Sequence, residues 1–261
     1  MKPVRRLENV GFPSLLVLRY HLKFVGGGGC SMGRTIAIAN QKGGVGKTTT
    51  AINLSAAVAK AGKRTLLVDV DPQANATSGL GVPRNSNHQN IYHALVLQQQ
   101  LRQVLVRTEF LVDLVPSDRN LAGAEIELIE FPNREFLLAK ALEPVNSEYD
   151  YIFLDCPPAL NLLTVNALAA ADSLLVPIQC EYYALEGVTE LFNTMTSIRR
   201  AVNPTLRIEG LLLTMYDDRI NLSSAVARPS RVLWQLGFED ANPSERSTCR
   251  GSQPWAASDL L

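Results

Sequence analysis

The stretch RTIAIANQKGGVGKTTT, residues 34–50, decides the fold. Its first half is a short apolar, β-branched run that is typical of a buried strand. Helical periodicity begins at Thr48 and continues until Gly62. The glycine-rich residues 43–46 lie between the two, where a backbone without side chains can curl its N–H groups around an anion. The stretch therefore predicts a phosphate-binding loop between a first strand and a first helix.

The residues of this loop are suited to bind a nucleoside triphosphate with its magnesium ion. Lys47 is placed to neutralise the β and γ phosphates, and the Thr48 hydroxyl is placed to ligate Mg²⁺. The positive end of the following helix adds a favourable field for the anion. We expect ATP and Mg²⁺ as ligands, with nucleotide contacts from Gly43, Gly44, Val45, Gly46, Lys47, Thr48 and Thr49.

Strand and helix patterns alternate along most of the remaining chain. Apolar runs typical of buried strands occupy residues 64–69, 110–115, 151–155, 173–178 and 208–214, and helical segments are expected near 121–142, 160–171 and 184–202. Such alternation predicts an α/β fold with a doubly wound, mainly parallel sheet flanked by helices. In that fold the ligand site lies beyond the carboxyl ends of the strands.

Three carboxylates follow strands of this predicted sheet. Asp69 and Asp71 lie at the end of one strand, and Asp155 ends another after four apolar residues. A carboxylate buried at a strand end needs a partner, and Mg²⁺ held through water is a suitable one. The prolines at 157–158 stiffen the following turn. Cys156 is interpreted as a small buried side chain and not as a nucleophile.

The composition of the chain argues against several kinds of site and partner. The 25 Lys and Arg residues balance 25 Asp and Glu residues, so any DNA contact must be local. The four cysteines contain no CxxC pair, which argues against a zinc site or a disulfide framework and fits a reducing cytoplasm. Every apolar run is shorter than the roughly 18 residues that a membrane-spanning helix needs, and no membrane partner is expected.

The motifs together resemble the ParA/Soj chromosome-partitioning ATPases of the ParA/MinD superfamily. In NQKGGVGKTTT, Gln41 replaces the usual first glycine and Lys42 precedes Gly43, as in the deviant Walker A motif of that group. The strings DVDPQ, DCPP, QCEYYALEGV and LLLTMYDDRINL also resemble the family. The resemblance implies that Lys42 reaches the partner's nucleotide across a dimer interface. It further implies that Asp71 positions the attacking water.

The same resemblance implies a function and a set of roles. The expected protein is a Mg-ATP-dependent ATPase that forms a homodimer in the ATP state, binds DNA non-specifically and is stimulated by a ParB-like partner, in the cytoplasm at the nucleoid. Arg219 corresponds to a family arginine that contacts DNA. The expected catalytic residues are Lys42, Lys47, Asp71 and Asp155, and the expected metal-site residues are Thr48, Asp69 and Asp155, with Asp69 near the outer shell.

Other functions stay open at the level of sequence. A MinD-like or other cargo-positioning ATPase would carry the same loop and differ in its partner. A hydrolytically inert nucleotide-binding scaffold is another alternative, because the family's closing elements are not visible after residue 228. An iron–sulfur reductase is disfavoured, since the cysteines form no plausible cluster site.

Pattern changes suggest three parts of the chain. Residues 1–31 end in a four-glycine run and are expected to be a disordered leader, residues 32–228 to be the ATPase domain, and residues 229–261 to be an atypical tail. The abrupt loss of periodicity after residue 228 is what a shifted reading frame would produce. We therefore expect a frameshifted or truncated product.

Overall fold

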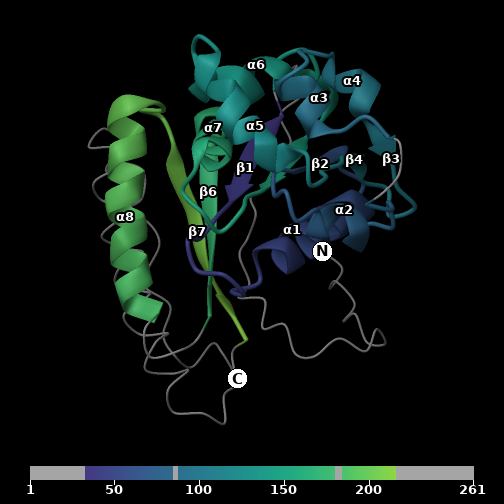
Figure 1. Ribbon diagram of the computed structural model, residues 1–261. Coiled ribbons are helices and arrows are strands. Elements are labelled where there is room, and N and C mark those ends of the chain that lie inside the picture. The colour runs from purple at the N-terminus through teal and green to yellow at the C-terminus, as the bar shows by residue number, and fades with distance from the viewer. Residues whose placement is uncertain (1–32, 85–87, 180–183, 216–261) are drawn as a thin grey trace, which may run out of the picture.

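The computed structural model describes residues 33–84, 88–179 and 184–215 (Figure 1). The strands are β1 (Arg34–Ile38), β2 (Thr65–Asp69), β3 (Val106–Arg107), β4 (Asp113–Val115), β5 (Tyr151–Asp155), β6 (Ser173–Gln179) and β7 (Arg207–Thr214). The helices are α1 (Lys47–Lys60), α2 (Asn75–Gly79), α3 (Ile91–Leu95), α4 (Leu101–Val104), α5 (Leu121–Glu127), α6 (Leu137–Leu142), α7 (Leu162–Ala170) and α8 (Ala184–Ala201). Short 3₁₀ turns are η1 (Leu128–Glu130), η2 (Arg134–Phe136) and η3 (Asn146–Glu148).

Within the described residues, the strands form one seven-stranded sheet in the order β3-β4-β2-β5-β1-β6-β7. All neighbouring pairs are parallel except β3 and β4. The chain winds from the central β1 towards β4, returns to β5, and then builds β6 and β7 on the other side. This confirms the doubly wound α/β prediction, and it brings the carboxyl ends of β1, β2 and β5 together at one edge.

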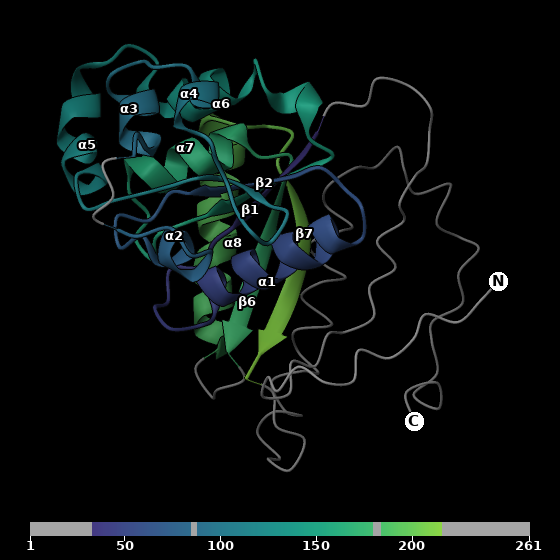
Figure 2. The ribbon, with the colours of Figure 1, turned by 90° about the vertical axis from the view of Figure 1, so that its right-hand side faces the viewer.

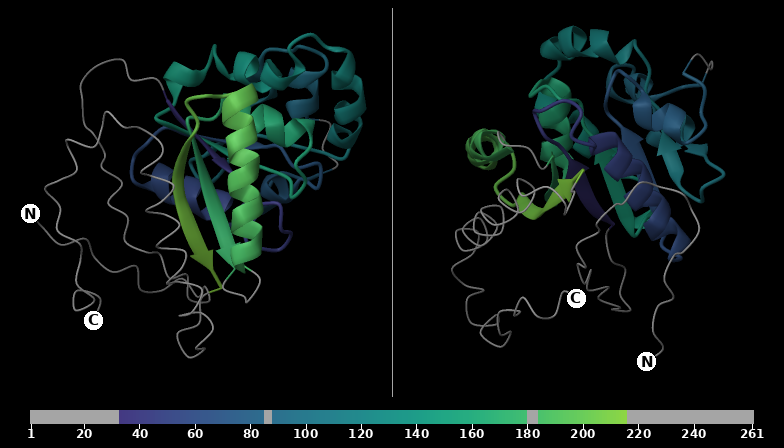
Figure 3. Two further views of the ribbon diagram at one scale, coloured as in Figure 1. Left: turned by 90° about the vertical axis from the view of Figure 1, so that its left-hand side faces the viewer. Right: turned by 90° about the horizontal axis from the view of Figure 1, so that it is seen from below.

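Two apolar cores cover the two faces of the sheet. Alternation along β1 divides its side chains, because Ile36 and Ile38 pack in the core that contains α1 and α2, whereas Ala37 packs in the other core. Figure 2 shows α1 and α2 below the sheet and α3 to α7 above it in that view. Helix α8 runs along β6 and β7 (Figure 3) and adds Met195 and Ile198 to the larger core.

The structure corrects two of the predicted elements. The strand predicted at 110–115 is only β4, because Leu111 has a φ of 62° in the turn that joins β3 to β4. The antiparallel strand β3 and the short helices α2, α3 and α4 were absent from the predicted set. The helix predicted at 121–142 breaks into α5, η1, η2 and α6, since Pro132 cannot continue a helical hydrogen-bond ladder.

Several sequence predictions lie outside the described residues. These are the leader at 1–31, the tail at 229–261 and Arg219. The three-part division of the chain stays a prediction. No helix among residues 33–84, 88–179 and 184–215 combines the length and the apolar character that crossing a membrane requires.

Candidate functional site

The loop between β1 and α1 has the shape of a phosphate cradle. Gly44 and Gly46 have φ values of 74° and 87°, in the left-handed region that favours glycine. A Cβ atom at Gly43 or Gly44 would meet no heavy atom within 4 Å, so this side of the loop is open. Helix α1 has 14 residues and no side-chain cap at Gly46. Its first-turn N–H groups are therefore left for a ligand.

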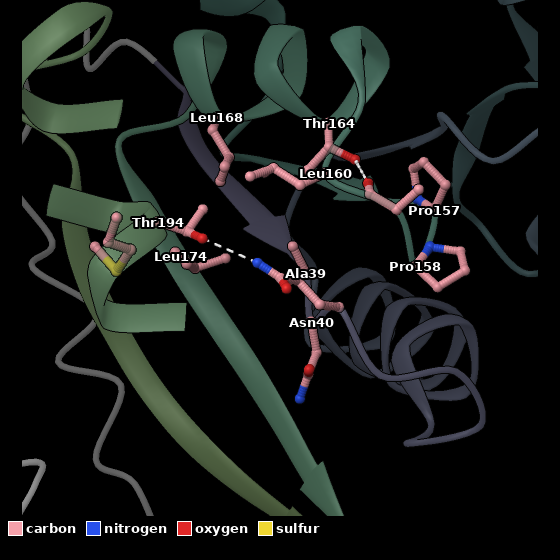
Figure 4. Close-up of a pocket in the computed structure, with 12 residues that line it drawn as sticks. Ala39, Asn40, Pro157, Pro158, Leu160, Thr164, Leu168, Leu174 and Thr194 are labelled. Atoms are coloured by element: carbon pink, nitrogen blue, oxygen red, sulfur yellow. Dashed lines mark hydrogen bonds between the residues drawn. The ribbon is translucent and has the colours of Figure 1, made fainter. Parts of the chain in front are cut away.

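Three elements on one side of the sheet hold the loop. Asn40 Nδ2 donates to the Pro177 carbonyl oxygen of β6 at 2.7 Å. Gln41 Nε2 donates to Thr194 Oγ1 of α8 at 2.9 Å, a contact drawn dashed in Figure 4. At the far end of the loop, Thr214 Oγ1 of β7 donates to the Val45 carbonyl oxygen at 2.8 Å. The loop is thus fixed at both ends before any ligand binds.

Lys47 is the first residue of α1, and its side chain reaches back to this loop. Its side chain is buried, and Nζ donates to the Lys42 carbonyl oxygen at 2.9 Å. Burial lowers the pKa of the Lys47 ammonium, and the negative charges of Asp155 and Asp71 oppose that change. The ammonium is therefore held beside two carboxylates and next to the open side of the loop, where it can meet a phosphate group.

Asp69 is fully buried and has hydrogen bonds at both carboxylate oxygens. Oδ2 accepts from the amide and the hydroxyl of Thr77, each at 2.7 Å, and Oδ1 accepts from the Asp71 amide at 3.2 Å. Thr77 Oγ1 in turn accepts from the Ser117 amide at 2.9 Å. Burial raises the pKa of the Asp69 carboxyl, while these hydrogen bonds act in the opposite direction. Asp69 therefore fastens α2 and the loop after β4 to the end of β2.

Asp71 shapes the turn after β2. Its Oδ1 accepts from the Gln73 amide at 2.8 Å, and its carbonyl oxygen accepts from the Ala74 amide at 2.9 Å. The side chain keeps 7% of its surface exposed, whereas Asp69 and Asp155 keep none. Asp71 is thus the one carboxylate of the three that touches solvent at this edge.

Asp155 differs from both. It is completely buried, and neither carboxylate oxygen has a hydrogen-bond partner of normal geometry among the described residues. Burial raises the pKa of the Asp155 carboxyl, and the charge of Asp69 raises it further, while the Thr48 hydroxyl and Lys47 oppose the rise. A buried carboxylate without a partner is costly. A cation beside Thr48 would satisfy it, so these residues fit Mg²⁺.

The loop after Asp155 is tied to the start of α7. Thr164 Oγ1 donates to the Ala159 carbonyl oxygen at 2.6 Å, and Asn161 Oδ1 accepts from the Thr164 amide at 3.0 Å. A cavity of about 20 Å³ separates this loop from the start of the phosphate loop (Figure 4). Its lining includes Pro157, Gln41 and Thr194. The space is large enough for about one water molecule.

Comparisons with known proteins agree with this geometry. A family model described as an AAA domain matches residues 33–208. The chain is 53% identical over 205 residues to the chromosome partitioning protein ParA of Myxococcus xanthus, covering 78% of this chain and 72% of that protein. It is also 53% identical over 196 residues to the sporulation initiation inhibitor protein Soj of Bacillus subtilis, covering 75% and 78%.

The chain belongs to the ParA/Soj family. Among solved structures, a cobyrinic acid a,c-diamide synthase from Mycobacterium smegmatis with bound ADP and magnesium is 39% identical, with a TM-score of 0.74. The alignment covers 77% of this chain and 82% of that one. The chain therefore has the fold of the ParA/Soj family, which is a family of P-loop ATPases.

The predicted ParA/Soj site residues mostly converge. Lys47, Thr48, Asp71 and Asp155 meet at the carboxyl edge of the sheet, and Lys42 lies exposed on the loop above Lys47. Val45 is buried, and Thr49 is exposed on the first turn of α1. Asp69 joins the group through its neighbours, but its oxygens point to Thr77 and Asp71.

Sequence reasoning missed three hydroxyl residues that support the site. Thr77 holds Asp69, Thr194 holds Gln41, and Thr214 holds Val45. Thr214 gave one usable signal, since it ends a predicted strand at the edge where the ligand site was expected. Thr77 and Thr194 lie on helices, and nothing in the sequence distinguishes them from surface threonines.

Proposed function

We propose that this chain is a Mg-ATP-dependent ATPase that partitions DNA. The observation that carries the proposal is the pairing of a buried lysine in an open glycine loop with a buried carboxylate, Asp155, that has no hydrogen bond of normal geometry among the described residues. A phosphate group at the loop and a cation at Asp155 would complete both. A relative that is 53% identical over 205 residues carries the name chromosome partitioning protein ParA, which supports DNA as the cargo.

Each residue has a proposed role. The amides of the loop and of the first turn of α1 hold the phosphates, and the Lys47 ammonium leaves the Lys42 carbonyl to bind the β and γ oxygens. Thr48 and Asp155 hold Mg²⁺, which supplies charge neutralisation on the transferring phosphoryl group. Asp71, the partly exposed carboxylate, orients the attacking water. Asp69 acts as a positioning residue that fixes the turn bearing Asp71.

The finer part of the proposal concerns assembly. Lys42 is exposed on the loop beside the nucleotide position, where a lysine can reach a second copy of the chain. We propose that two chains close around two nucleotides and that the closed homodimer binds DNA non-specifically at the nucleoid. A ParB-like partner then stimulates hydrolysis and ends DNA binding. Arg219 is proposed to contact DNA backbone phosphates.

Nucleotide binding and turnover test the proposal. In Lys47→Ala we expect turnover to fall by about a hundredfold or more, because a cation that stabilises the transferring group is lost. Lys60→Ala, at the exposed last position of α1, is the matched control and should behave as the unchanged chain. Turnover and ATP affinity are measured with and without Mg²⁺, DNA and a ParB-like protein.

The outcomes separate the alternatives. Equal turnover in the two lysine variants would contradict the proposed site. ATP binding with background turnover under all conditions would favour an inert scaffold. Turnover that DNA and the ParB-like protein leave unchanged would favour another cargo.

A further inference from the structure

Gln41 joins the start of the phosphate loop to helix α8. Its Nε2 donates to Thr194 Oγ1 at 2.9 Å, although the two residues lie 153 positions apart in the chain. The neighbouring backbone is held as well, because the Lys42 amide donates to Asn40 Oδ1 at 3.0 Å. Gln41 is therefore a fixed connection between the loop and a helix that runs along β6 and β7 (Figure 3).

The proposed nucleotide acts on the residue next to Gln41. Lys47 Nζ donates to the Lys42 carbonyl oxygen at 2.9 Å, and in the proposed function this ammonium moves to the β and γ phosphates. The Lys42 carbonyl then loses a charged donor, while the amides that follow it gain a phosphate. A Cβ atom at Gly43 or Gly44 would meet no heavy atom within 4 Å among the described residues, so packing does not hold that side of the loop. The order of residues 41–44 therefore depends on the ligand.

A cavity beneath the contact shows that packing between the loop and α8 is incomplete. Its volume is about 20 Å³, and both Gln41 and Thr194 line it (Figure 4). Much of the remaining lining is apolar and includes Leu168, Leu174 and Met195. Side chains beside a cavity lack dispersion contacts on that side, so they shift at a smaller cost than side chains in close packing. The interior next to Thr194 can therefore take up a small movement of the helix.

Helix α8 is anchored beyond Thr194, towards its C-terminal end. Ile198, one turn further along, is buried in the larger core together with Met195. Arg199 Nε donates to the Leu206 carbonyl oxygen at 2.7 Å, which holds the end of the helix to the turn before β7. A displacement at Thr194 therefore acts on a helix whose far end is fixed, and it tilts α8 against the sheet. Small shifts of packed helices are a common form of switching.

We propose that the Gln41–Thr194 hydrogen bond couples the nucleotide state of the phosphate loop to the position of α8, with Thr194 as a positioning residue for the loop. The inference rests on the proposed function for the identity of the ligand, because a phosphate group must draw Lys47 away from the Lys42 carbonyl. The coupling is reciprocal, since a change that the loop imposes on α8 returns to the loop as a change in nucleotide affinity. Helix α8 is then the element through which the chain displays its nucleotide state.

Hydrogen exchange of α8 tests the coupling without turnover. We expect Mg-ATP to order the loop of the full chain and to slow exchange of the amides at 193–201 by about fivefold, the factor that one net hydrogen bond contributes. Thr194→Val lacks the hydroxyl and should lose this slowing, whereas Thr194→Ser should keep it. Ser197→Ala is the matched control on the same helix, because the exposed Ser197 hydroxyl donates to the Asn193 carbonyl oxygen within α8.

Steady-state kinetics separates positioning from a purely structural role. The loop binds the phosphates in the ground state and in the transition state, so Thr194→Val should raise KM for ATP about fivefold and leave kcat unchanged. A variant that is only less stable would contain less active protein, which lowers the apparent kcat and leaves KM as it was. Thermal unfolding midpoints of all variants record any loss of fold.

Three results would overturn the coupling. The first is an equal slowing of α8 exchange by Mg-ATP in Thr194→Val and in the unchanged chain. The second is identical behaviour of Thr194→Val and Thr194→Ser, and the third is a fall in kcat with no change in KM. Loss of the slowing in Ser197→Ala would also count against the coupling, because it would assign the effect to the helix as a whole.

A comparison without nucleotide keeps the coupling separate from the proposed function. Lys47→Ala removes the donor to the Lys42 carbonyl in the ligand-free chain, so exchange in α8 should rise. The same substitution made in Thr194→Val should add no further rise, because the connection to α8 is already lost. If calorimetric titration shows that the unchanged chain binds no ATP, the proposed function fails and this comparison decides the coupling. An equal rise in the two backgrounds would overturn it.

Discussion

The ends of β2 and β5 carry the same residue at paired positions and use it in opposite ways. Asp69 and Asp155 are register partners on neighbouring strands, and both are fully buried. Asp69 accepts three hydrogen bonds, whereas Asp155 accepts none of normal geometry from the described residues. The fold itself therefore satisfies the carboxylate at the end of β2, whereas it leaves the carboxylate at the end of β5 without a hydrogen bond of normal geometry from the described residues. Burial alone does not separate a structural carboxylate from a functional one.

Asp155→Asn should have the largest effect on turnover, and it should lower turnover without lowering stability. We expect turnover to fall about a hundredfold or more, since the variant loses a charge at the proposed Mg²⁺ position. The nucleotide-free chain should become no less stable. Burial raises the pKa of the Asp155 carboxyl in the folded chain, so the folded state loses stability as the pH rises through this raised pKa and the carboxyl ionises. Asn carries no charge, so the variant does not lose stability in this way. Thermal unfolding in EDTA and turnover with Mg²⁺ measure the two effects.

Asp69→Asn, unlike Asp155→Asn, should make the nucleotide-free chain less stable. An amide NH₂ group cannot accept from Thr77 or Asp71, so buried donors lose their partner and the chain should lose about 1–3 kcal/mol of unfolding free energy. Denaturant unfolding of the nucleotide-free chain measures this loss. If Asp69→Asn is as stable as the unchanged chain while Asp155→Asn unfolds more easily, the contrast between the two strand ends is wrong.

Substitutions of Thr214 should have the smallest effect, because this residue contacts the phosphate loop and neither Asp69 nor Asp155. Thr214→Val keeps the shape but loses the bond to the Val45 carbonyl, and we expect about 1 kcal/mol less stability with weaker ATP affinity. Thr214→Ser keeps a hydroxyl and should bind ATP as the unchanged chain does. Calorimetric titration with ATP compares them, and equal affinities for Val and Ser would show that the hydroxyl does not position the loop.

The local signals in the sequence gave most of the fold and the centre of the site. The sequence predicted the phosphate-binding residues Gly43, Gly44, Gly46, Lys47 and Thr48. It could do so because phosphate binding itself requires these residue types at this spacing. The three strand-end carboxylates followed from parallel-sheet geometry. What sequence could not reveal was which carboxylate is satisfied, because that depends on Thr77, which reaches Asp69 only after α2 folds back.

The missed elements have a similar cause. The run at 110–115 is apolar enough for a strand, yet the chain must reverse before β4 to pair with β3, and the reversal uses Leu111. The contacts of Gln41 with Thr194 and of Val45 with Thr214 join residues 153 and 169 positions apart. Periodicity within short windows carries no information about such pairs.

The brace from Thr214 to the phosphate loop has a consequence for how the chain is made. The loop is synthesised early, but the hydroxyl that fixes its second end comes from β7, the last strand in chain order among the described residues. A growing polypeptide therefore contains the whole glycine motif long before Thr214 can form the hydrogen bond that fixes the end of the loop. We expect nucleotide affinity to arise late in synthesis, so that unfinished chains on the ribosome stay out of the proposed ATP-dependent dimer.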